Sequence, residues 1–275
     1  MTVEEFLNNF TLIKPFKDTG QKKVYLLGPK AGGDPVILKI GKSSSPALFK
    51  RAQREVEVQR TLDSGYYPKN INFILFDGNQ FVIVEEYIES DALSNCFDRF
   101  TEPLDILILL RHLISGLDLI WKSRITHRDL KPDNILIKPD KTPVIIDLGI
   151  VLAEDKTMLT SFPCGPCTPA YAAPEQLKYR RAEIDHRTDQ FILGIDMLQL
   201  IAGGKHPFDN VGSGLPIPEN ILFGNLVKDN LDSDKFKPMS GLIMKLLAPE
   251  PYKRFSNTDA LKNVIEKCIG AYDEA

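Results

Sequence analysis

The segment HRDLKPDNILI, residues 127–137, gathers polar side chains that could do chemistry directly before an apolar run. Within its first eight positions stand two carboxylates, one amide, and His, Arg and Lys. A solvated loop can carry this much charge, but it rarely meets an apolar strand so abruptly. Catalytic groups held on a loop by a rigid strand have this pattern. Carboxylates can orient a reacting hydroxyl, and carboxylate and amide oxygens are ligands for Mg²⁺. The segment therefore predicts a catalytic loop.

The elements before this loop are predicted to be mainly strands. β-Branched or aromatic runs with Gly-Pro and GGDP punctuation predict an antiparallel meander, with strands at 10–16, 22–28, 35–41, 70–78 and 79–88. One stretch with helical spacing, 45–62, separates the third strand from the fourth.

Beyond Ser90 the pattern is mainly helical, with helices expected at 103–123, 188–202, 238–248 and 257–271. Two short strands, NILI and PVIID, are the exception. The predicted fold class is α+β, with a small antiparallel β lobe carrying one helix (1–88) and a larger, mainly helical lobe (89–275). No flexible linker separates them, so a cleft between the lobes is the expected ligand site.

Composition limits the classes of function. The 275 residues are 43% hydrophobic and 26% charged, as in an ordinary soluble globular protein. A net charge of −3 provides no overall basic field, so neither nucleic acid nor an anionic membrane is expected as a partner. The acidic start MTVEEFLNNF lacks the features of a signal peptide, and the apolar run LDILILL is too short to span a membrane. Four cysteines without an export signal predict reduced thiols and a cytoplasmic location.

Four motifs together resemble a known family. VILK, HRDLKPDN, DLG and APE occur in this order, ending at Lys39, Asn134, Gly149 and Glu175. They are similar to the strand-3 lysine, catalytic loop, metal-binding motif and activation-segment end of eukaryotic-type protein kinases. Each motif alone is weak, but four in register over nearly the whole chain are specific.

The resemblance implies roles for the residues of the catalytic loop. Asp129 would orient the substrate hydroxyl, and Lys131 would bring positive charge to the transferred phosphoryl group. Asn134 and Asp147 would bind Mg²⁺, and Leu136 would lie under the adenine of ATP. The alternative for Asp129, Asn134 and Asp147 is capping and turn chemistry, which these residue types favour.

The small lobe is expected to bind the nucleotide. Lys39 would pair with Glu55 and hold the α- and β-phosphates, as in the family. Glu57 is the rival partner, because helical register is uncertain from sequence, and Lys39 could instead be a strand-end lysine in solvent. The adenine site implied by the resemblance comprises Val24, Ile37 and the backbone of Glu86 and Ile88.

The sequence departs from the family where the glycine-rich loop should precede Val24. Lys17, Thr19 and Lys22 stand in place of the three glycines, and only Gly20 remains, displaced by one position. Backbone amides should therefore approach phosphates less closely. Positive charge at Lys22 and its neighbour could compensate, or these lysines could simply be exposed.

A second departure concerns the back of the nucleotide site. In the family that this sequence resembles, the position of Glu85 usually holds an apolar residue or threonine. The position of Gln59 usually holds an aliphatic residue. A buried carboxylate needs a hydrogen-bond partner. Because the family places these positions side by side, we expect Gln59 and Glu85 to hydrogen-bond.

The large lobe also contains expected supporting residues. The stretch CTPAYAAPE resembles the activation-segment end of serine/threonine kinases, so Thr168 should contact Asp129 and Lys131 and belong to the catalytic set. We expect an ion pair between Glu175 and Arg254, and we expect Asp189 to brace the catalytic loop.

The activation segment carries two further features. Arg128 beside Asp129 is the family's mark of control by phosphorylation, with Thr157, Thr160 and Ser161 as candidate acceptors, although exposed hydroxyls are common. Cys164-Gly165-Pro166-Cys167 matches the thioredoxin tetrapeptide but lacks its βαβ context, so coincidence and a regulatory dithiol both stand as interpretations.

The sequence thus predicts a kinase that uses ATP and Mg²⁺ to phosphorylate Ser or Thr hydroxyls of a protein substrate. One rival is a pseudokinase that binds nucleotide or serves as a scaffold, which the altered glycine loop and polar back pocket favour. Another is a kinase of small molecules, which resembles this fold but lacks the APE segment and Thr168.

Overall fold

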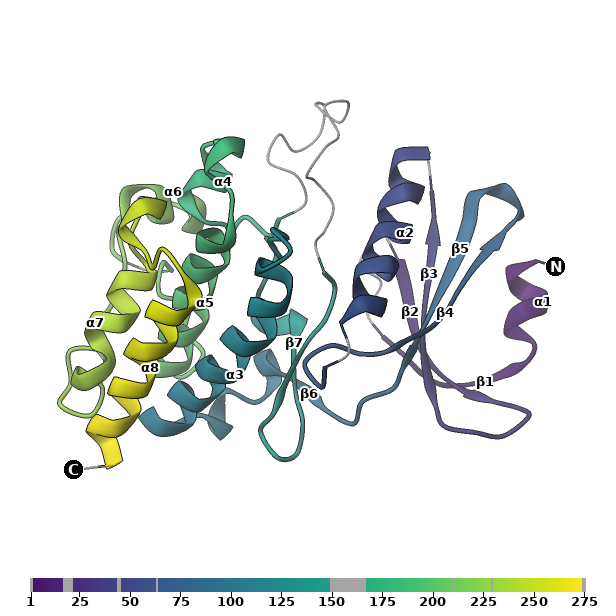
Figure 1. Cartoon of the computed structure of the whole chain (residues 1–275), viewed down its shortest axis with the longest axis horizontal. Helices are drawn as coiled ribbons and strands as arrows, with labels where there is room; N and C mark the ends of the chain where they lie inside the picture. The colour runs from purple at the N-terminus through teal and green to yellow at the C-terminus, as the bar shows by residue number, and fades with distance from the viewer. Residues whose placement is uncertain are drawn as a thin grey trace. The chain divides into compact units, whose positions relative to one another are not determined.

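The computed structural model divides into two compact units, residues 1–89 and 90–275, which we call the small and the large lobe (Figure 1). Among the residues that it describes, no helix has the length and apolar character needed to cross a membrane. The described residues are 2–16, 22–43, 46–62, 64–148, 167–209, 211–228 and 230–273.

The small lobe is built on an antiparallel sheet of five strands in the order β1-β2-β3-β5-β4. The first three strands form the expected meander, and β5 then pairs with β3, which leaves β4 at the edge. Gly32 and Gly33 turn the chain between β2 and β3 with φ of 88° and 116°, a conformation that suits glycine. The strands are β1 Phe10–Pro15, β2 Lys22–Pro29, β3 Val36–Lys42, β4 Asn70–Phe76 and β5 Gln80–Glu86.

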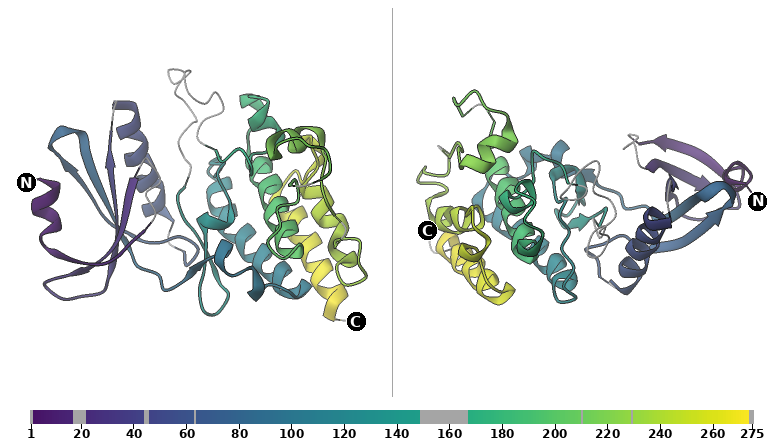
Figure 2. Two further views of the ribbon diagram at one scale, coloured as in Figure 1. Left: turned by 180° about the vertical axis from the view of Figure 1, so that it is seen from behind. Right: turned by 90° about the horizontal axis from the view of Figure 1, so that it is seen from above.

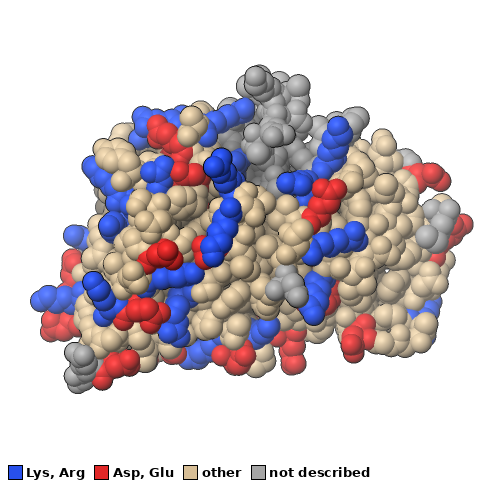
Figure 3. Space-filling view, viewed as in Figure 1, with Lys and Arg blue, Asp and Glu red and all other residues tan. Residues whose placement is uncertain are grey.

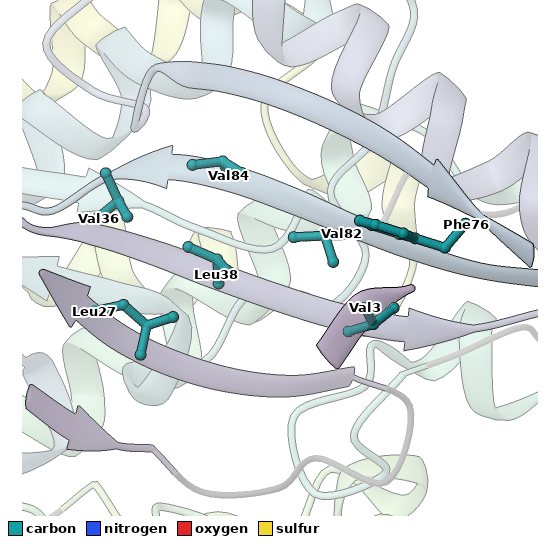
Figure 4. Close-up of a cluster of buried hydrophobic side chains, with 7 residues drawn as sticks. All are labelled: Val3, Leu27, Val36, Leu38, Phe76, Val82 and Val84. Atoms are coloured by element: carbon teal, nitrogen blue, oxygen red, sulfur yellow. The ribbon is translucent and has the colours of Figure 1, made fainter. Parts of the chain in front are cut away.

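A short helix, α1 (Val3–Leu7), covers one face of this sheet. It begins at a capping box, in which the Thr2 hydroxyl accepts from the Glu5 amide and the Glu5 carboxylate accepts from the Thr2 amide. Its Val3 packs on buried aliphatic and aromatic side chains of the strands, which form one apolar cluster (Figure 4): Leu27, Val36, Leu38, Phe76, Val82 and Val84.

The longer helix α2 (Pro46–Thr61) covers the opposite face. Ala52 and Val56 of the helix pack on Phe81 and Ile83 of β5. Gly41 lies opposite Phe81 in the β3–β5 pairing, where a Cβ atom would overlap the aromatic ring. This face, between sheet and helix, holds the polar residues of the small-lobe site.

The large lobe is mainly helical. The central helix α5 (His186–Ile201) is buried along nearly its whole length and packs against α3 (Pro103–Trp121) and α7 (Lys237–Leu246). Helix α8 (Thr258–Asp273) packs on α3 and α7, and the views of Figure 2 show these helices side by side. Shorter helices are α4 (Pro174–Leu177) and α6 (Ile217–Phe223).

A small antiparallel sheet in the large lobe carries the catalytic loop. Its order is β6-β7-β8, with bounds Asp91–Ala92, Ile135–Ile137 and Pro143–Ile145. The loop residues 127–134 run directly into the central strand β7, as the sequence predicted.

The expected strands and long helices are all present, and the predicted α+β fold class is confirmed. Among its described residues, however, the small lobe carries two α-helices, α1 and α2, where one was expected. Helix α1 was missed because it is only five residues long, although Thr2-x-x-Glu5 is a capping-box signature. Lys/Arg and Asp/Glu side chains are interspersed on the face shown in Figure 3, in keeping with the nearly balanced composition.

Candidate active site

Strand β7 fixes the direction of the catalytic loop. Ile135 and Ile137 are fully buried, whereas Leu136 between them is half-buried on the opposite side of the strand. Before the strand, Pro132–Asn134 form one 3-10 turn. The apolar run thus anchors the loop, and the strand's alternation leaves Leu136 as the side chain that is not part of the core.

Asp129, Lys131 and Thr168 meet as expected. The Asp129 Oδ1 atom accepts hydrogen bonds from the Thr168 amide at 2.7 Å and from the Thr168 hydroxyl at 2.8 Å. Lys131 Nζ donates to the same hydroxyl at 2.8 Å and lies 3.7 Å from Asp129 Oδ2. The carboxylate is therefore held through one oxygen and faces a cation with the other.

The side-chain amide of Asn134 is oriented so that its oxygen is available as a metal ligand. Its amide nitrogen donates to the Asp129 carbonyl at 2.8 Å, and its Oδ1 accepts no hydrogen bond from any described residue. Asp147 follows β8 with a φ of 55°, an uncommon backbone conformation for aspartate that is often found at functional sites. An amide oxygen and a carboxylate are the hard ligands that Mg²⁺ prefers, so these two residues fit the ion.

Asp189, at the start of α5, supports the catalytic loop through hydrogen bonds to its backbone. Its carboxylate accepts hydrogen bonds from the His127 amide (2.9 Å), the Arg128 amide (2.8 Å) and the Trp121 indole (2.8 Å). Burial raises the pKa of the Asp189 carboxyl, while these donated hydrogen bonds act in the opposite direction. Arg128 has a φ of 70°, and the hydrogen bond that its amide donates to Asp189 helps to hold this strained conformation.

The expected ion pair between Glu175 and Arg254 is also confirmed. Arg254 donates from Nη1 and Nη2 to the two carboxylate oxygens at 2.6 and 2.9 Å, and both side chains are almost completely buried. Thr188 of α5 donates to the same carboxylate at 2.8 Å. Next to Glu175, the Gln176 amide donates to the Arg128 carbonyl at 2.9 Å, a link between α4 and the catalytic loop that the sequence did not reveal.

In the small lobe, the expected pair between Lys39 and Glu55 is wrong. Lys39 Nζ lies 2.9 Å from Glu85 Oε2, and Glu55 Oε2 is bound by Lys22 Nζ at 2.8 Å. The cause is sheet register. Lys39 is the Cα partner of Ile83, so Glu85, two residues further along β5, lies diagonally next to Lys39 on the same face. The rival partner, Glu57, is exposed and contacts Arg54 and Gln53 of its own helix.

The expected hydrogen bond between Gln59 and Glu85 is confirmed. Gln59 Nε2 donates to Glu85 Oε1 at 3.0 Å and to the Pro68 carbonyl at 2.8 Å. Glu85 is therefore held by Gln59 through one oxygen and by Lys39 through the other. Both side chains of the Lys39–Glu85 pair are over nine-tenths buried, so this carboxylate is a compensated charge of the small-lobe interior.

The residues expected to contact adenine are all described. Val24 is the Cα partner of Lys39, and Ile37 that of Glu85, so both share the α2-facing side of the sheet and are half-buried there. The Glu86 amide donates to the Lys69 carbonyl at 3.0 Å. Ile88, two residues further, is half-buried.

Several predictions fall outside the described residues. These are the altered glycine loop at Lys17, Thr19 and Gly20, and the candidate phosphorylation sites Thr157, Thr160 and Ser161. The tetrapeptide is described only at Cys167, because Cys164 lies outside as well.

The sequence did not predict the observed ion-pair partners of two residues in the small-lobe site. Glu85 was expected to bind Gln59 but not Lys39, and Lys22 was not expected to bind Glu55. For the first, the sequence held only part of the signal: alternation along "VILK" and "VIVEE" defines the face of each strand on which Lys39 and Glu85 lie, but the pairing of the two strands brings them together.

Comparison with known proteins agrees with the motifs. A family model described as "Protein kinase domain" matches residues 20–265. The chain is 27% identical over 275 residues to serine/threonine-protein kinase pkn2 of Myxococcus xanthus, covering 93% of this chain and 32% of that protein. It is 28% identical over 265 residues to maternal embryonic leucine zipper kinase of Xenopus tropicalis, covering 92% and 38%.

A third relative is serine/threonine-protein kinase PknF of Mycobacterium tuberculosis, 26% identical over 262 residues, with 90% of this chain and 53% of that protein covered. The chain thus spans about a third to a half of the length of these relatives. Because the family model covers most of the chain and its motif residues occupy the expected contacts in the large lobe, this chain belongs to the protein kinase family.

Proposed function

We propose that the chain is an active kinase that transfers the γ-phosphoryl group of ATP, with Mg²⁺, to Ser or Thr hydroxyls of proteins. The observation that carries this proposal is the Asp129 carboxylate, held by Thr168 and facing Lys131. The names of two of the relatives, both serine/threonine-protein kinases, support the class of substrate.

The two oxygens of Asp129 would have different tasks. Oδ1 is occupied by two short hydrogen bonds from Thr168, whereas Oδ2 has only longer contacts, 3.4 Å to Asn134 Nδ2 and 3.7 Å to Lys131 Nζ. Oδ2 would therefore accept the hydrogen bond of the acceptor hydroxyl and take its proton as the new O–P bond forms. Lys131 would stabilise negative charge that develops on the transferred group.

The remaining residues would hold the nucleotide and the metal. Asn134 Oδ1 and the Asp147 carboxylate would bind Mg²⁺, which when bound neutralises phosphate charge. Lys39 would bind the α- and β-phosphates. Val24, Ile37 and Leu136 would contact the adenine ring, and the Glu86 carbonyl and Ile88 amide would hydrogen-bond its edge. Glu55 is left out of this proposal, because its carboxylate is bound by Lys22.

The test is a transfer assay with γ-labelled ATP, Mg²⁺ and a mixture of protein substrates. Label should appear on the substrate as phosphoserine or phosphothreonine, and an Asp147→Ala variant should give none. Mass spectrometry of the same reactions would show whether Thr157, Thr160 or Ser161 is autophosphorylated. Dominant phosphotyrosine would contradict the roles of Lys131 and Thr168.

A pseudokinase is the second candidate function, and one observation favours it: Lys39 pairs with Glu85 in place of the helix glutamate. Such a protein would bind nucleotide or a partner protein without transferring phosphate. Binding of ATP by the parent protein, measured by calorimetry, together with no transfer at any protein concentration, would establish this alternative.

A further inference from the structure

Two lysines and two glutamates lie in the space between the small-lobe sheet and helix α2. Lys22 and Lys39 come from β2 and β3, Glu85 comes from β5, and Glu55 comes from α2. Gln59, one helical turn after Glu55, points to the same space and binds Glu85. These side chains form two separate ion pairs, Lys22–Glu55 and Lys39–Glu85.

The two pairs differ in what they connect. Lys39 and Glu85 stand on hydrogen-bonded neighbouring strands, so the spacing of their Cα atoms is set by sheet register and does not depend on where α2 lies. Lys22 and Glu55 connect a strand to the helix, and the Lys22 side chain is one-fifth exposed. The first pair is rigid and buried, while the second ties α2 to the sheet.

The surroundings of Glu85 support a permanent role as a counter-ion. Both carboxylate oxygens are engaged, one by the Lys39 ammonium and one by the Gln59 amide. The Gln59 amide also donates to the Pro68 carbonyl, so Gln59 belongs to the same buried cluster, while the opposite charge comes from Lys39. A carboxylate buried to this extent without a cation would be costly, and Lys39 supplies that cation.

We propose that Glu85 is the positioning residue for Lys39, and that Lys22 with Glu55 forms a separate clamp that attaches α2 to the sheet. The inference rests on the proposed function, in which Lys39 binds the phosphates of ATP. It predicts that the orientation of the phosphate-binding lysine is independent of the α2 glutamate. Glu55 therefore stabilises the helix, while Glu85 determines nucleotide affinity.

The first part of the test needs no nucleotide. Rates of amine labelling at Lys22 and Lys39 are measured by mass spectrometry in the parent, Glu55→Gln and Glu85→Gln proteins. Glu85→Gln should raise the labelling rate of Lys39 by roughly tenfold, as expected for loss of about 1.4 kcal/mol of pairing. Glu55→Gln should raise the rate at Lys22 and leave Lys39 within about threefold of the parent.

The second part measures the Kd of ATP with Mg²⁺ by calorimetry in the same proteins. Glu85→Gln should raise the Kd by about tenfold or more, and Glu55→Gln by less than about threefold. Gln59→Leu is the matched control, because it disturbs the same buried cluster but keeps the Lys39–Glu85 pair. It should leave the Kd within about threefold of the parent even if it lowers the melting temperature as much as Glu85→Gln.

The outcomes separate the inference from the proposed function. If Glu55→Gln accelerates labelling of Lys39, or weakens ATP more than Glu85→Gln does, Lys39 turns to Glu55 and the inference is wrong. This arm decides the question even if Glu85→Gln does not fold. If the labelling pattern holds but the parent binds no ATP, the pairing stands and the proposed function fails.

Discussion

The two lobes of this protein differ in how far their charged residues follow the motifs of the protein kinase family. In the large lobe, the expected partners meet: Thr168 binds Asp129, Asp189 binds the loop amides, and Glu175 binds Arg254. In the small lobe, the expected pair of Lys39 with Glu55 is replaced by two other pairs.

The expected partners were predicted less well in the small lobe because more charged side chains lie within reach of one another there. Each large-lobe contact joins groups for which the resemblance to the family supplies both partners, in loops or in the first turns of helices. The small lobe adds Lys22 and Glu85, at positions where the resemblance implies glycine and an uncharged residue. Two cations and two carboxylates can pair in two ways, and sheet register selects one. A motif therefore predicts a partner reliably only when no additional charge faces the same site.

The largest expected effect follows from changing Asp129, the proposed catalytic carboxylate of the large lobe. Asp129→Asn keeps an acceptor for the Thr168 bonds but removes the proton acceptor, so the rate of phosphotransfer should fall by roughly 10²–10⁴-fold. Thermal unfolding of the variant should match the parent. A variant that folds normally and retains most of its activity would show that Asp129 is not the catalytic carboxylate.

The second largest expected effect is on the free energy of unfolding. Arg254→Met removes the cation from a pair whose side chains are 0% and 1% exposed, so the free energy of unfolding should fall by about 3–5 kcal/mol. Lys22→Met is the matched change in the small lobe. Its pair is partly exposed, and the expected loss is only about 1 kcal/mol or less. Equal losses in urea unfolding would mean that the two pairs are equally buried in solution.

A third prediction tests a large-lobe carboxylate that lacks a partner. Asp196 of α5 is completely buried, and neither of its oxygens has a hydrogen-bond partner among the described residues. Burial raises the pKa of this carboxyl well above its ordinary value. Asp196→Leu has a similar shape and should stabilise the protein at pH 7 by roughly 1–3 kcal/mol.

The pH dependence gives the control for this prediction. Above the ordinary carboxyl pKa of about 4, unfolded Asp196 loses its proton while the folded form keeps it. Its contribution to stability is therefore fully present below that pH and declines as pH rises toward the raised folded value. The parent should thus lose more stability than Asp196→Leu between pH 4 and pH 7. Parallel pH profiles would refute the assignment of a neutral buried carboxyl.

The smallest expected effect is the coupling between Gln59 and Glu85. In a cycle of Gln59→Leu, Glu85→Met and the double variant, the cost of removing the Glu85 carboxylate from Lys39 occurs in both Glu85 variants and cancels. The remaining coupling free energy should be about 1–2 kcal/mol, the value of a buried hydrogen bond to a charged group. Strict additivity in denaturant unfolding would show that the two side chains do not meet in solution.

Much of the fold could be predicted because its elements carry strong local patterns. The strands alternate, most of the long helices have apolar periodicity, and the catalytic loop is a contiguous motif before a buried strand. The hydrogen bond between Gln59 and Glu85 was predictable because a buried carboxylate requires a donor. Helix α1 could have been found from its capping box.

The ion-pair partners of the small lobe could not be obtained in the same way. Alternation places Lys39 and Glu85 on defined faces of their strands, but only the pairing of β3 with β5 makes them diagonal neighbours. The choice of Lys22 by Glu55 depends on the rotation of α2 against the sheet, which helical spacing alone does not define. Long-range register, and not residue type, was the missing information.

The decisive experiment measures the initial rate of γ-phosphoryl transfer from ATP to protein serine or threonine, compared in the parent, Glu55→Gln and Asp129→Asn proteins. We predict transfer by the parent, a rate within about threefold of it for Glu55→Gln, and almost none for Asp129→Asn. An inactive parent would contradict the proposed kinase activity. An active parent with a Glu55→Gln variant as inactive as Asp129→Asn would contradict the assignment of Lys39 to Glu85.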